Sequence, residues 1–352
     1  MQKILITGAN GHLGANLVRR LIGDGADLRV LLRPGSDNSP TDNLNVERVF
    51  GDLRDAASIA AATNRCHAIY HCAAQLSTAS GGEHEIFASN VLGTRNLLDA
   101  ARRSGVSRIV VTGSLSAAGH RLDGPTDESV PFNPFERHLP YAVSKAAVEH
   151  ECLKAFAEGL DVVIAVSCAI LGPNDFKPSR MGQVLIDHAR GRLRAYIPGS
   201  FEFVAARDIV EGHILCMRLG RAGQKYIFST GYLTMDEIMD LFEAVTGHPK
   251  PRLRLTPGLM TPIAEIGAFV HRHILLGRRQ LLTPAAVRLL RMGRRADTGK
   301  AQRELGYRPT SIAEAVREAS ECFVRRGMID RPRAGAIAAG RRPADKARAG
   351  SS

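Results

Sequence analysis

The strongest constraint on how this chain folds is a glycine-rich turn between an apolar run and an amphipathic helix. Ile4-Leu5-Ile6 is followed at once by Thr7-Gly8-Ala9-Asn10-Gly11-His12-Leu13-Gly14. Apolar residues then recur with helical period at Leu13, Leu17, Val18, Leu21 and Ile22. The pattern predicts a buried strand, a tight turn and a helix whose first N–H groups have no partner within the helix.

A helix start of this kind binds phosphate groups, because its unpaired N–H groups carry partial positive charge. Glycines allow the backbone to come into contact with a pyrophosphate. The turn is therefore a candidate dinucleotide site, although an ordinary strand–helix turn has the same spacing. The candidate binding residues in it are Gly8, Asn10, Gly11, His12, Leu13 and Gly14.

Strand and helix patterns alternate through the first half of the chain. Short apolar runs predict strands at Leu28–Leu32, Val46–Phe50, Ala68–His71, Arg108–Thr112 and Val162–Ser167. Helical patterns lie between them at Asp55–Thr63, Glu85–Ser104 and Tyr141–Ala157. This alternation predicts an α/β fold, a Rossmann doubly wound parallel sheet that binds ligands at the carboxyl ends of its strands.

The second half has a looser pattern. Helices are expected at Met181–Arg190 and Ile209–Leu219. Thr234-Met235-Asp236-Glu237 is a capping box, Thr283-Pro284 starts another helix, and Ser311 is expected to cap the last one.

These patterns indicate a domain organisation. We expect residues 1–167 to form an NAD(P)-binding Rossmann domain, completed by about 203–230 of the chain. Residues 168–202 and 231–330 would form a smaller, interleaved substrate lobe. Residues 331–352 contain mainly Ala, Gly, Arg and Pro without periodicity, which predicts a disordered basic tail.

Composition places the chain among soluble globular proteins. Of its 352 residues, 44% are hydrophobic, and no uninterrupted apolar run is long enough to span a bilayer. The first residues form a predicted strand, so no signal peptide is expected. The six cysteines lie far apart without a C-x-x-C pair and indicate neither a metal site nor a disulfide framework. We expect a protein of the reducing cytoplasm.

The net charge of +12 comes from two segments. Residues 271–308 hold ten basic and two acidic residues, and residues 331–352 hold six basic residues and one acidic. The rest of the chain is near neutral, which argues against a nucleic-acid binder. A local anionic contact or a solvated basic surface remains.

Tyr141-Ala142-Val143-Ser144-Lys145 places a tyrosine and a lysine one turn apart on a predicted helix. A tyrosine hydroxyl has a pKa near 10, too high for useful proton transfer at neutral pH. One cation about 4 Å away, at an effective dielectric near 20, supplies about 4 kcal/mol, or roughly three pKa units. We expect Lys145 to lower the pKa of Tyr141 and make it a working acid and base, an ordinary surface pair being the alternative.

Thr112-Gly113-Ser114 follows the fifth predicted strand, at the end where ligands bind. A serine hydroxyl there can donate to a substrate carbonyl and stabilise developing oxyanion charge. Ser116 is a second candidate for this role, and a plain turn residue is the alternative. The order of glycine turn, serine and Tyr-x-x-x-Lys along the chain favours the chemical role.

Together these motifs resemble the extended short-chain dehydrogenase/reductase family, or NAD-dependent epimerase/dehydratase family, from Met1 to about Asp330. The chain is similar to its dihydroflavonol-reductase-like branch and to hopanoid-associated sugar-epimerase-like proteins. This closer similarity rests on Gly172–Pro178, Ala189–Arg192 and Glu304–Pro309. The family-wide motifs are Thr7–Gly14, Gly51–Leu53, His71–Ala74, Asn90–Leu97, Ser114, Tyr141 with Lys145, and Leu171–Pro173.

The resemblance implies roles for individual residues. Tyr141 would be the general acid and base, Lys145 would also hold the nicotinamide ribose, and Ser114 would polarise the carbonyl. Asn90 would lie on a helix near the proton relay, with an ordinary polar helix residue as the alternative. The implied cofactor contacts, at adenine and along the cofactor channel, are Asp52, Leu53, Ala73 and Ala74.

The end of the second predicted strand bears on which dinucleotide binds. An acidic side chain there accepts hydrogen bonds from the ribose 2′-hydroxyl of NAD. This chain instead has Leu31-Leu32-Arg33-Pro34-Gly35-Ser36. A cation fits a 2′-phosphate, so Arg33 favours NADP(H) over NAD(H).

A departure from the nucleotide-sugar epimerases of the family bears on the substrate. Those enzymes usually carry Arg and Asn in the segment before Gly-Pro, where this chain has Val166 and Ala169. Apolar side chains cannot pair with the oxygens of a diphosphate. Cys168, between them, is expected to be a small apolar filler rather than a nucleophile.

Leu255–Leu276 is a further apolar segment, interrupted by one glutamate and two histidines and followed by Arg278 and Arg279. The interruptions exclude a membrane span. The segment could lie on a membrane surface, with residues 255–308 as a peripheral contact, or form a lid over a lipophilic substrate. An amphipathic helix packed on the core is the alternative.

We therefore expect an NAD(P)H-dependent oxidoreductase of ketoreductase or alcohol dehydrogenase type. Its small-molecule substrate would be a lipophilic ketone or secondary alcohol, such as a polyketide, terpenoid or sterol-like compound. A sugar or nucleotide-sugar epimerase/dehydratase with bound NAD is the alternative, and a non-catalytic dinucleotide-binding partner protein is a third. The resemblance also implies a homodimer formed through Glu85–Ser104 and Tyr141–Ala157.

Overall fold

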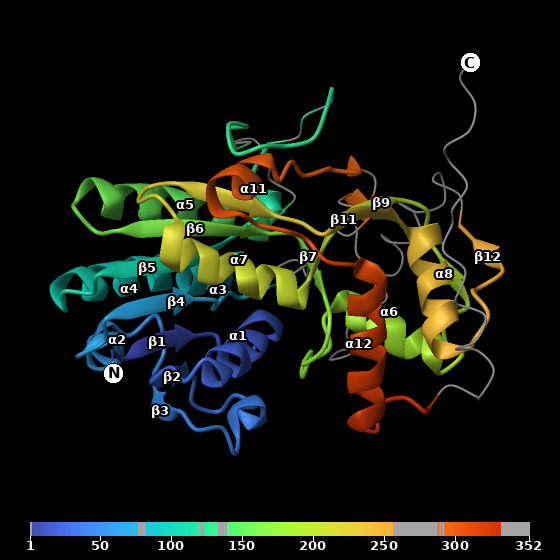
Figure 1. Ribbon diagram of the computed structural model, residues 1–352, viewed down its shortest axis with the longest axis horizontal. Coiled ribbons are helices and arrows are strands. Elements are labelled where there is room, and N and C mark those ends of the chain that lie inside the picture. The colour runs from blue at the N-terminus through green and yellow to red at the C-terminus, as the bar shows by residue number, and fades with distance from the viewer. Residues whose placement is uncertain are drawn as a thin grey trace.

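The computed structural model describes residues 2–76, 82–119, 121, 123–132, 139–255, 287–288, 290 and 292–331. In these ranges the chain forms a helix-covered parallel sheet with a lobe at one end, on the right in Figure 1. The predicted fold class, an α/β Rossmann doubly wound sheet, is confirmed.

The large sheet has seven parallel strands in the order β3-β2-β1-β4-β5-β6-β10. The chain builds outward from β1 to β3, crosses back to β4, and then builds outward in the other direction. Ligands of such sheets bind at this reversal, outside the carboxyl ends of the strands. The strands are β1 (Ile4–Thr7), β2 (Leu28–Leu32), β3 (Glu47–Phe50), β4 (Ala68–His71), β5 (Arg108–Ser114), β6 (Val162–Ser167) and β10 (Lys225–Phe228).

Helices cover both faces of the sheet, because neighbouring strand residues point to opposite sides and most of them are apolar. Leu5 and Val111 face α2, α4 and α5, whereas Ile6 and Val110 face α1, α7 and α11. These helices are α1 (His12–Gly23), α2 (Ala56–Thr63), α4 (Gly93–Arg103), α5 (Pro140–Ala157), α7 (Ala206–Leu219) and α11 (Gly299–Leu305).

The lobe has a separate core that includes Phe203, Phe242 and Phe323. It begins at the carboxyl end of β6 with β7, and β10 later returns to complete the large sheet (Figure 1). The lobe therefore lies beyond the carboxyl ends of the large sheet. Its elements are β7 (Ala169–Leu171), β8 (Ala195–Tyr196), β9 (Ser200–Ala205), β11 (Gly231–Thr234), β12 (Leu253–Arg254), α6 (Arg180–Ala189), α8 (Met235–Thr246) and α12 (Ile312–Arg325).

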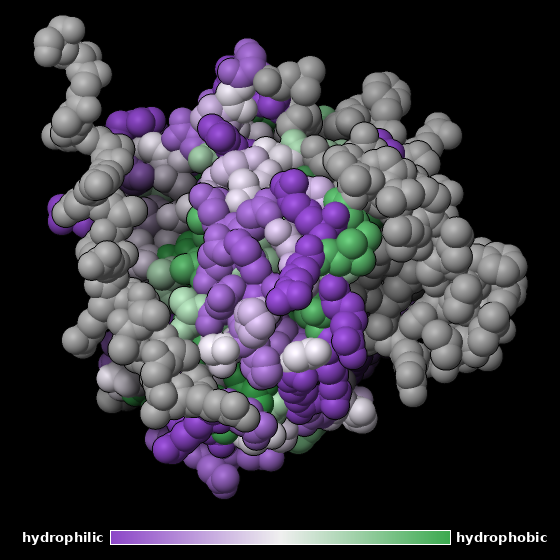
Figure 2. All heavy atoms as spheres, turned by 90° about the vertical axis from the view of Figure 1, so that its right-hand side faces the viewer, coloured by the Kyte–Doolittle hydropathy of each residue, from purple (hydrophilic) through white to green (hydrophobic). Residues whose placement is uncertain are grey.

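The described surface at the lobe end is mostly hydrophilic, with hydrophobic residues in small separate groups (Figure 2). The predicted capping box at α8 is confirmed, since Thr234 accepts from the Glu237 N–H and Glu237 accepts from the Thr234 N–H. Within the described ranges, no helix has the length and apolar character needed to cross a membrane.

Three local predictions are wrong. Glu85–Ser104 is not one helix: α3 (Glu83–Phe87), a π turn at Ala88–Leu92 and α4 follow one another. β5 runs two residues further than expected, so Ser114 ends the strand instead of following it. Ser311 precedes α12, but its side chain makes no capping hydrogen bond.

Some predictions fall on parts of the chain that the structure does not describe. The apolar segment beyond Leu255, the Thr283-Pro284 helix start and the basic tail beyond Arg331 lie outside the described residues. Their expected roles stay predictions.

Candidate active site

Two glycines shape the turn after β1. Gly8 has φ +74°, and a Cβ on it would lie 2.5 Å from the Ala73 nitrogen. A Cβ on Gly14 would lie 2.1 Å from the Gly8 oxygen. Only glycine allows these close approaches, which pack the turn against the end of β4 and α1 against the turn.

Gly11 is less crowded than these two glycines. A Cβ on Gly11 would meet the Gly8 oxygen at 3.3 Å, a tight contact that needs a small shift, and the residue is exposed. Gly11 is the N-cap of α1 and supplies no side-chain cap. The first intrahelical bond runs from the Ala15 N–H to the Gly11 oxygen (2.8 Å), so the N–H groups of residues 12–14 precede it. A pyrophosphate on these N–H groups accounts for a glycine at position 11, so the turn fits a dinucleotide.

The side chain of His12 points to the lobe. Its Nε2 lies 3.0 Å from the carbonyl oxygen of Pro173, to which Asn16 also donates at 2.9 Å. Phe176 follows Pro173 by three residues, and the guanidinium of Arg326 lies 4.6 Å from the centre of its ring. The start of α1 is therefore bonded to the loop that follows β7, so the candidate phosphate site and the lobe are in contact.

Arg33 begins the loop after β2, and Asn10 binds this loop from the glycine turn. Asn10 donates to the Asp37 carbonyl (3.2 Å) and to the side-chain oxygen of Asn38 (3.0 Å), which attaches this loop to the glycine turn. Arg33 is exposed, and its Nε donates to the Ser36 hydroxyl at 3.0 Å. The residue that directly follows β2 is therefore a cation, with the Ser36 hydroxyl bonded to it.

Asp52 and Leu53 follow β3. Arg54 binds the Asp52 carboxylate with two nitrogens (2.9 and 2.7 Å) and lowers its pKa to about 2. A Cβ on Gly93 would lie 2.8 Å from the Leu53 Cβ, and the Leu53 carbonyl accepts from Asn96 at 3.0 Å. Both residues thus have fixed positions at the carboxyl edge of the sheet.

Ala73 and Ala74 lie in the segment after β4, where Ala73 is half-buried and Ala74 is exposed. The Ala73 N–H points to the Thr7 hydroxyl at 3.4 Å. Asn90 is 2% exposed and makes two hydrogen bonds with the backbone of Gln75, the residue after Ala74. Its Oδ1 accepts from the Gln75 N–H (2.7 Å), and its Nδ2 donates to the Gln75 carbonyl (3.1 Å). The π turn thus holds the segment in the manner of a strand partner.

Ser114 is the last residue of β5. Its Oγ lies 2.8 Å from the Ser116 hydroxyl and accepts from the Ser116 N–H at 3.3 Å. The two candidate serines therefore share a hydrogen bond. Ser114 also hydrogen-bonds with the Tyr141 side chain, a contact that favours a chemical role over that of a plain turn residue.

Tyr141 and Lys145 lie in the first turns of α5 as predicted, but their electrostatics differ from expectation. Burial raises the pKa of Tyr141 to about 12, opposed by the hydrogen bond with Ser114. Lys145 is 4% exposed, donates to the Thr112 carbonyl at 2.8 Å, and has its pKa lowered by burial to about 8. The predicted lowering of the Tyr141 pKa is therefore wrong for the protein alone, because desolvation dominates.

His213, which no sequence pattern predicted as a site residue, fixes Thr112. The Thr112 hydroxyl lies 2.8 Å from Nε2 of His213, whose Nδ1 lies 2.7 Å from the Ile209 carbonyl. Because a carbonyl only accepts, Nδ1 carries the proton and Nε2 accepts from Thr112. Burial lowers the pKa of His213 to about 4, so it is neutral. No local sequence signal marks this pair, since its members lie 101 positions apart.

Arg294 is a second residue that sequence analysis did not single out. Its Nη1 donates to the carbonyls of Leu115, Ser116 and Ala118, at 3.4, 3.3 and 2.8 Å. The turn immediately after Ser114 is thus bound by a residue from the basic stretch 271–308, in which Arg294 was one charge among ten.

The segment before Gly172-Pro173 is apolar where polar residues were expected in sugar-nucleotide enzymes. Val166 is 3% exposed in β6, paired with Gly113, and Ala169 begins β7. Burial raises the pKa of the Cys168 thiol well above its ordinary value, which argues against a nucleophilic thiolate.

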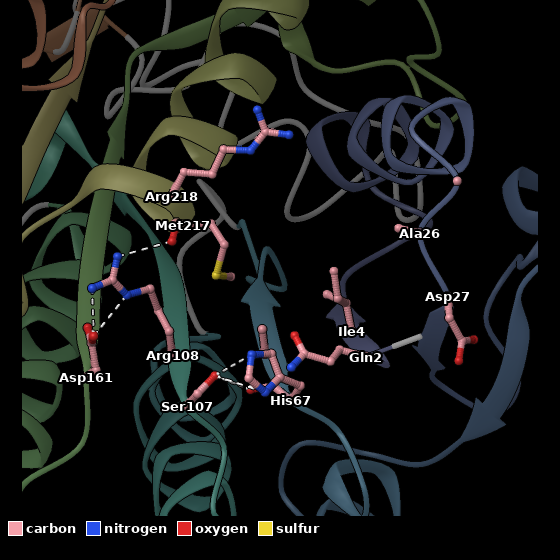
Figure 3. A pocket seen from close by; sticks show the side chains of 12 residues that line it. Gln2, Ile4, Ala26, Asp27, His67, Ser107, Arg108, Asp161, Met217 and Arg218 are labelled. Carbon is pink, nitrogen blue, oxygen red and sulfur yellow. Dashed lines mark hydrogen bonds and ion pairs between the residues drawn. The ribbon is translucent and has the colours of Figure 1, made fainter.

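A large hollow of about 680 Å³ lies at the opposite edge of the sheet (Figure 3). Its walls come from the amino ends of β1, β4 and β5 and from the end of α7. Arg108 binds Asp161 there at 2.7 Å, and the His67 ring lies 3.0 Å from the Ser107 hydroxyl. The hollow lies away from the glycine turn and from Tyr141, so it is not the candidate active site.

Comparison with known proteins agrees with this geometry. The model of the NAD dependent epimerase/dehydratase family matches residues 4–230, which include the glycine turn and the Tyr–Lys pair. "Sterol demethylase protein B" of Methylococcus capsulatus is 42% identical over 92% of this chain and 99% of its own length. "Putative dihydroflavonol 4-reductase" of Synechocystis is 31% identical over 92% of this chain and 95% of its own length.

Solved structures share the fold. The crystal structure of gox2253 has a TM-score of 0.81 and 31% identity, covering 94% of this chain and all of that one. The dTDP-glucose 4,6-dehydratase DesIV from Streptomyces venezuelae, solved with NAD bound, has a TM-score of 0.76 and 25% identity, covering 94% and 99% of the two chains. The chain belongs to the NAD dependent epimerase/dehydratase family and is an NAD(P)-dependent oxidoreductase of the extended short-chain dehydrogenase/reductase type.

Proposed function

We propose that the protein transfers a hydride between NADP(H) and the carbonyl or secondary alcohol carbon of a lipophilic, sterol- or terpenoid-like molecule. The observation that carries the proposal is the convergence of three groups at the carboxyl end of β5. Ser114 and Tyr141 share a hydrogen bond, and Lys145 is bonded to the Thr112 carbonyl two residues before Ser114. The glycine turn lies at the same edge of the sheet.

The chain's own groups move a proton and stabilise charge. The hydride would come from, or go to, a dinucleotide held at the glycine turn. In reduction, Ser114 donates a hydrogen bond to the substrate carbonyl oxygen, and Tyr141 gives that oxygen its proton as the carbon gains the hydride. Lys145 stabilises the phenolate left behind, and in oxidation the phenolate takes the proton of the alcohol. Because its pKa is about 12, Tyr141 is protonated at neutral pH and ready to donate.

The preference for NADP(H) is supported by Arg33, the residue that follows β2, and by the Ser36 hydroxyl bonded to it at 3.0 Å. A 2′-phosphate would gain charge-assisted hydrogen bonds there. We expect Arg33→Gln to weaken NADPH binding about tenfold or more and to leave NADH binding unchanged. Calorimetric titration of both dinucleotides measures this, and an equal loss for both would contradict the preference.

The substrate class is supported by two observations. Val166 and Ala169 offer no partners for a sugar diphosphate. The names of several relatives refer to sterols or other lipophilic molecules, including the protein of Methylococcus capsulatus and the "3beta-hydroxysteroid-dehydrogenase/decarboxylase isoform 1" of Arabidopsis thaliana, which is 27% identical over 91% of this chain and 79% of its own length.

The test compares wild-type protein with Tyr141→Phe while cofactor absorbance is followed with ring ketones, sterols and nucleotide sugars. We expect turnover of a lipophilic ketone or alcohol, and a loss of about 10²–10⁴-fold in the variant. Unchanged turnover would overturn the mechanism. Conversion of a nucleotide sugar without net change in absorbance would favour the epimerase/dehydratase alternative.

A homodimer through α4 and α5 remains part of the proposal. Leu153 and Phe156 of α5 are 49% and 44% exposed, an apolar surface on one of these helices. Light scattering of the purified protein measures the mass, and we expect Leu153→Glu to convert the dimer to a monomer. A monomeric wild-type protein would contradict the proposal.

A further inference from the structure

His71, the last residue of β4, is bonded at both ring nitrogens. It is 3% exposed, with Nδ1 2.6 Å from the Thr7 hydroxyl and Nε2 2.9 Å from the Thr94 hydroxyl. Thr7 precedes the glycine turn, and Thr94 lies in the first turn of α4. The imidazole therefore joins the strand that leads to the dinucleotide site to the helix beside Asn90.

The Asn90 carbonyl, which can only accept, sets the direction of every hydrogen bond in the series Thr7–His71–Thr94–Asn90. The Thr94 hydroxyl donates to the Asn90 carbonyl at 2.5 Å, so its oxygen must accept from Nε2–H of His71. Burial and the charge of Lys145 lower the pKa of His71 to about 3, so the ring carries one proton. Nδ1 then accepts from Thr7. Thr7 thus donates to His71, His71 to Thr94, and Thr94 to Asn90. The tautomer of His71 with its proton on Nε2 satisfies all three hydrogen bonds.

This series of hydrogen bonds ends at Asn90, which also contacts α5, the helix of Tyr141 and Lys145. Beside its two bonds to Gln75, the Asn90 amide donates to the Ser144 hydroxyl at 3.0 Å. The Ser144 hydroxyl in turn donates to the Tyr141 carbonyl at 2.8 Å. The backbone of Asn90 is thus held by Thr94 and His71, and its side chain is bonded to the first turn of α5.

We propose that His71 is a positioning residue whose single neutral tautomer holds Asn90 in register with the glycine turn and so aligns Tyr141 with the bound dinucleotide. The proposal rests on the proposed function of Tyr141. His71 touches no reacting atom. Its contribution is alignment, and small misplacements of a catalytic group reduce turnover strongly.

The lobe contains a matched pair that serves as a control. His188 is 2% exposed, and its Nδ1 lies 3.1 Å from the Thr246 hydroxyl, which donates to the Phe242 carbonyl at 2.7 Å. The Thr246 hydroxyl bonds a carbonyl four residues back, as the Thr94 hydroxyl does, and accepts from a buried histidine. Loss of either hydroxyl should cost similar stability, but only Thr94 leads to Asn90.

The first test is spectroscopic and needs no substrate. Proton–nitrogen NMR of the full-length protein labelled with 15N-histidine distinguishes protonated from unprotonated ring nitrogens, and the His71 signals are those that disappear in His71→Gln or change in Thr94→Ser. We expect Nε2 protonated and Nδ1 unprotonated between pH 6 and 8, which is about three to five units above the pKa of His71. Protonation at Nδ1, or titration in this range, would overturn the proposal whether or not the proposed reaction is correct.

The second test is kinetic and uses a ketone or alcohol that the wild-type protein turns over in the test of the proposed function. We expect Thr94→Val to lower kcat at least about tenfold, with the KM for the dinucleotide changed less than about twofold. Thr94→Ser keeps the hydroxyl and should restore kcat. Thr246→Val should lower the melting temperature by a similar amount and leave kcat unchanged. Equal kcat for Thr94→Val and Thr246→Val would assign His71 a structural role alone and overturn the proposal.

Discussion

The two edges of the large sheet use polar side chains in opposite ways. At the carboxyl edge, His71 and Lys145 are 3% and 4% exposed, bonded to hydroxyls or carbonyls, and have pKa values lowered by burial. At the amino edge, Arg108 pairs with Asp161, and Lys3 pairs with Glu47 near the solvent. The hollow lies at the amino edge (Figure 3), yet the groups suited to chemistry gather at the other.

Charge neutralisation, rather than the size of a hollow, distinguishes His71 and Lys145 from the ion pairs of the amino edge. Asp161 and Glu47 neutralise Arg108 and Lys3 and leave them little to offer a ligand, as Asp52 does for Arg54 at the carboxyl edge. A buried ammonium held by a carbonyl keeps its charge available for a phenolate or a ribose hydroxyl. Parallel topology adds to this asymmetry, because the starts of the helices that follow the strands face the carboxyl edge.

The largest effect is expected from removing the cation of the carboxyl edge. Lys145→Met should lower kcat by about 100-fold or more, because the phenolate of Tyr141 loses its stabilising charge. The matched control is Lys3→Met, since Lys3 pairs with Glu47 at 2.7 Å at the amino edge. Steady-state kinetics of both variants is the measurement, and equal losses would contradict the distinction.

The glycine turn should separate folding from binding. Gly11→Val suits the extended backbone of this residue (φ −86°, ψ 169°) and brings its Cβ to 3.3 Å from the Gly8 oxygen. It should lower the free energy of unfolding less than Gly14→Ala does, but bind the dinucleotide at least about tenfold more weakly, or about 1.4 kcal/mol. Gly14→Ala would place its Cβ 2.1 Å from the Gly8 oxygen and should lower the free energy of unfolding by about 1–3 kcal/mol. Calorimetric titration and urea denaturation measure the two. Tight binding by Gly11→Val would place the pyrophosphate elsewhere.

The pH dependence of kcat/KM tests whether the charge of Lys145 is required. Its pKa of about 8 means that the charged form prevails below that pH and is lost above it. In the direction of reduction, kcat/KM should therefore fall by about tenfold for each pH unit above 8, since this ratio reports groups of the free enzyme. Lys145→Arg stays charged and should move this fall to higher pH. A flat profile in the wild type up to pH 10 would show that the charge of Lys145 is not required.

The smallest effect on activity is expected at the amino edge. Arg108→Met leaves Asp161 without its partner and should lower the free energy of unfolding by about 1–2 kcal/mol. The value of kcat should stay within about twofold of the wild type, because Arg108 starts β5 and Ser114 ends it. Urea denaturation and kinetics on the same preparation check both statements. A large loss of kcat without loss of stability would mean that the hollow communicates with the active site.

Local sequence was enough for features whose partners lie within a few residues. The glycine turn, the capping box at Thr234 and the one-turn spacing of Tyr141 and Lys145 all depend on neighbours in the chain, so their patterns are visible before folding. The strands Leu28–Leu32, Ala68–His71 and Val162–Ser167 were predicted with the bounds that the structure has, because each is a short buried apolar run with polar or glycine residues nearby.

The π turn around Asn90 could not be predicted in this way. One extra residue in a helical turn does not change the periodic sequence pattern enough to be recognised. The irregular backbone at Ala88–Leu92 is accompanied by hydrogen bonds from the Asn90 side chain to Gln75 and Ser144, which are distant in sequence. The same holds for Arg294, whose sequence context is simply basic and whose partners are three carbonyls after Ser114.

Periodicity and spacing are properties of the chain, so the fold class, the glycine turn and the one-turn spacing of Tyr141 and Lys145 follow from sequence. Tertiary structure alone decided how these groups are tuned. Burial raised the pKa of Tyr141 where a neighbouring charge was expected to lower it, and histidines from β4 and α7 became fixed, neutral partners of Thr94 and Thr112. Desolvation and hydrogen-bond direction depend on which distant segments meet, and no local pattern contains that information.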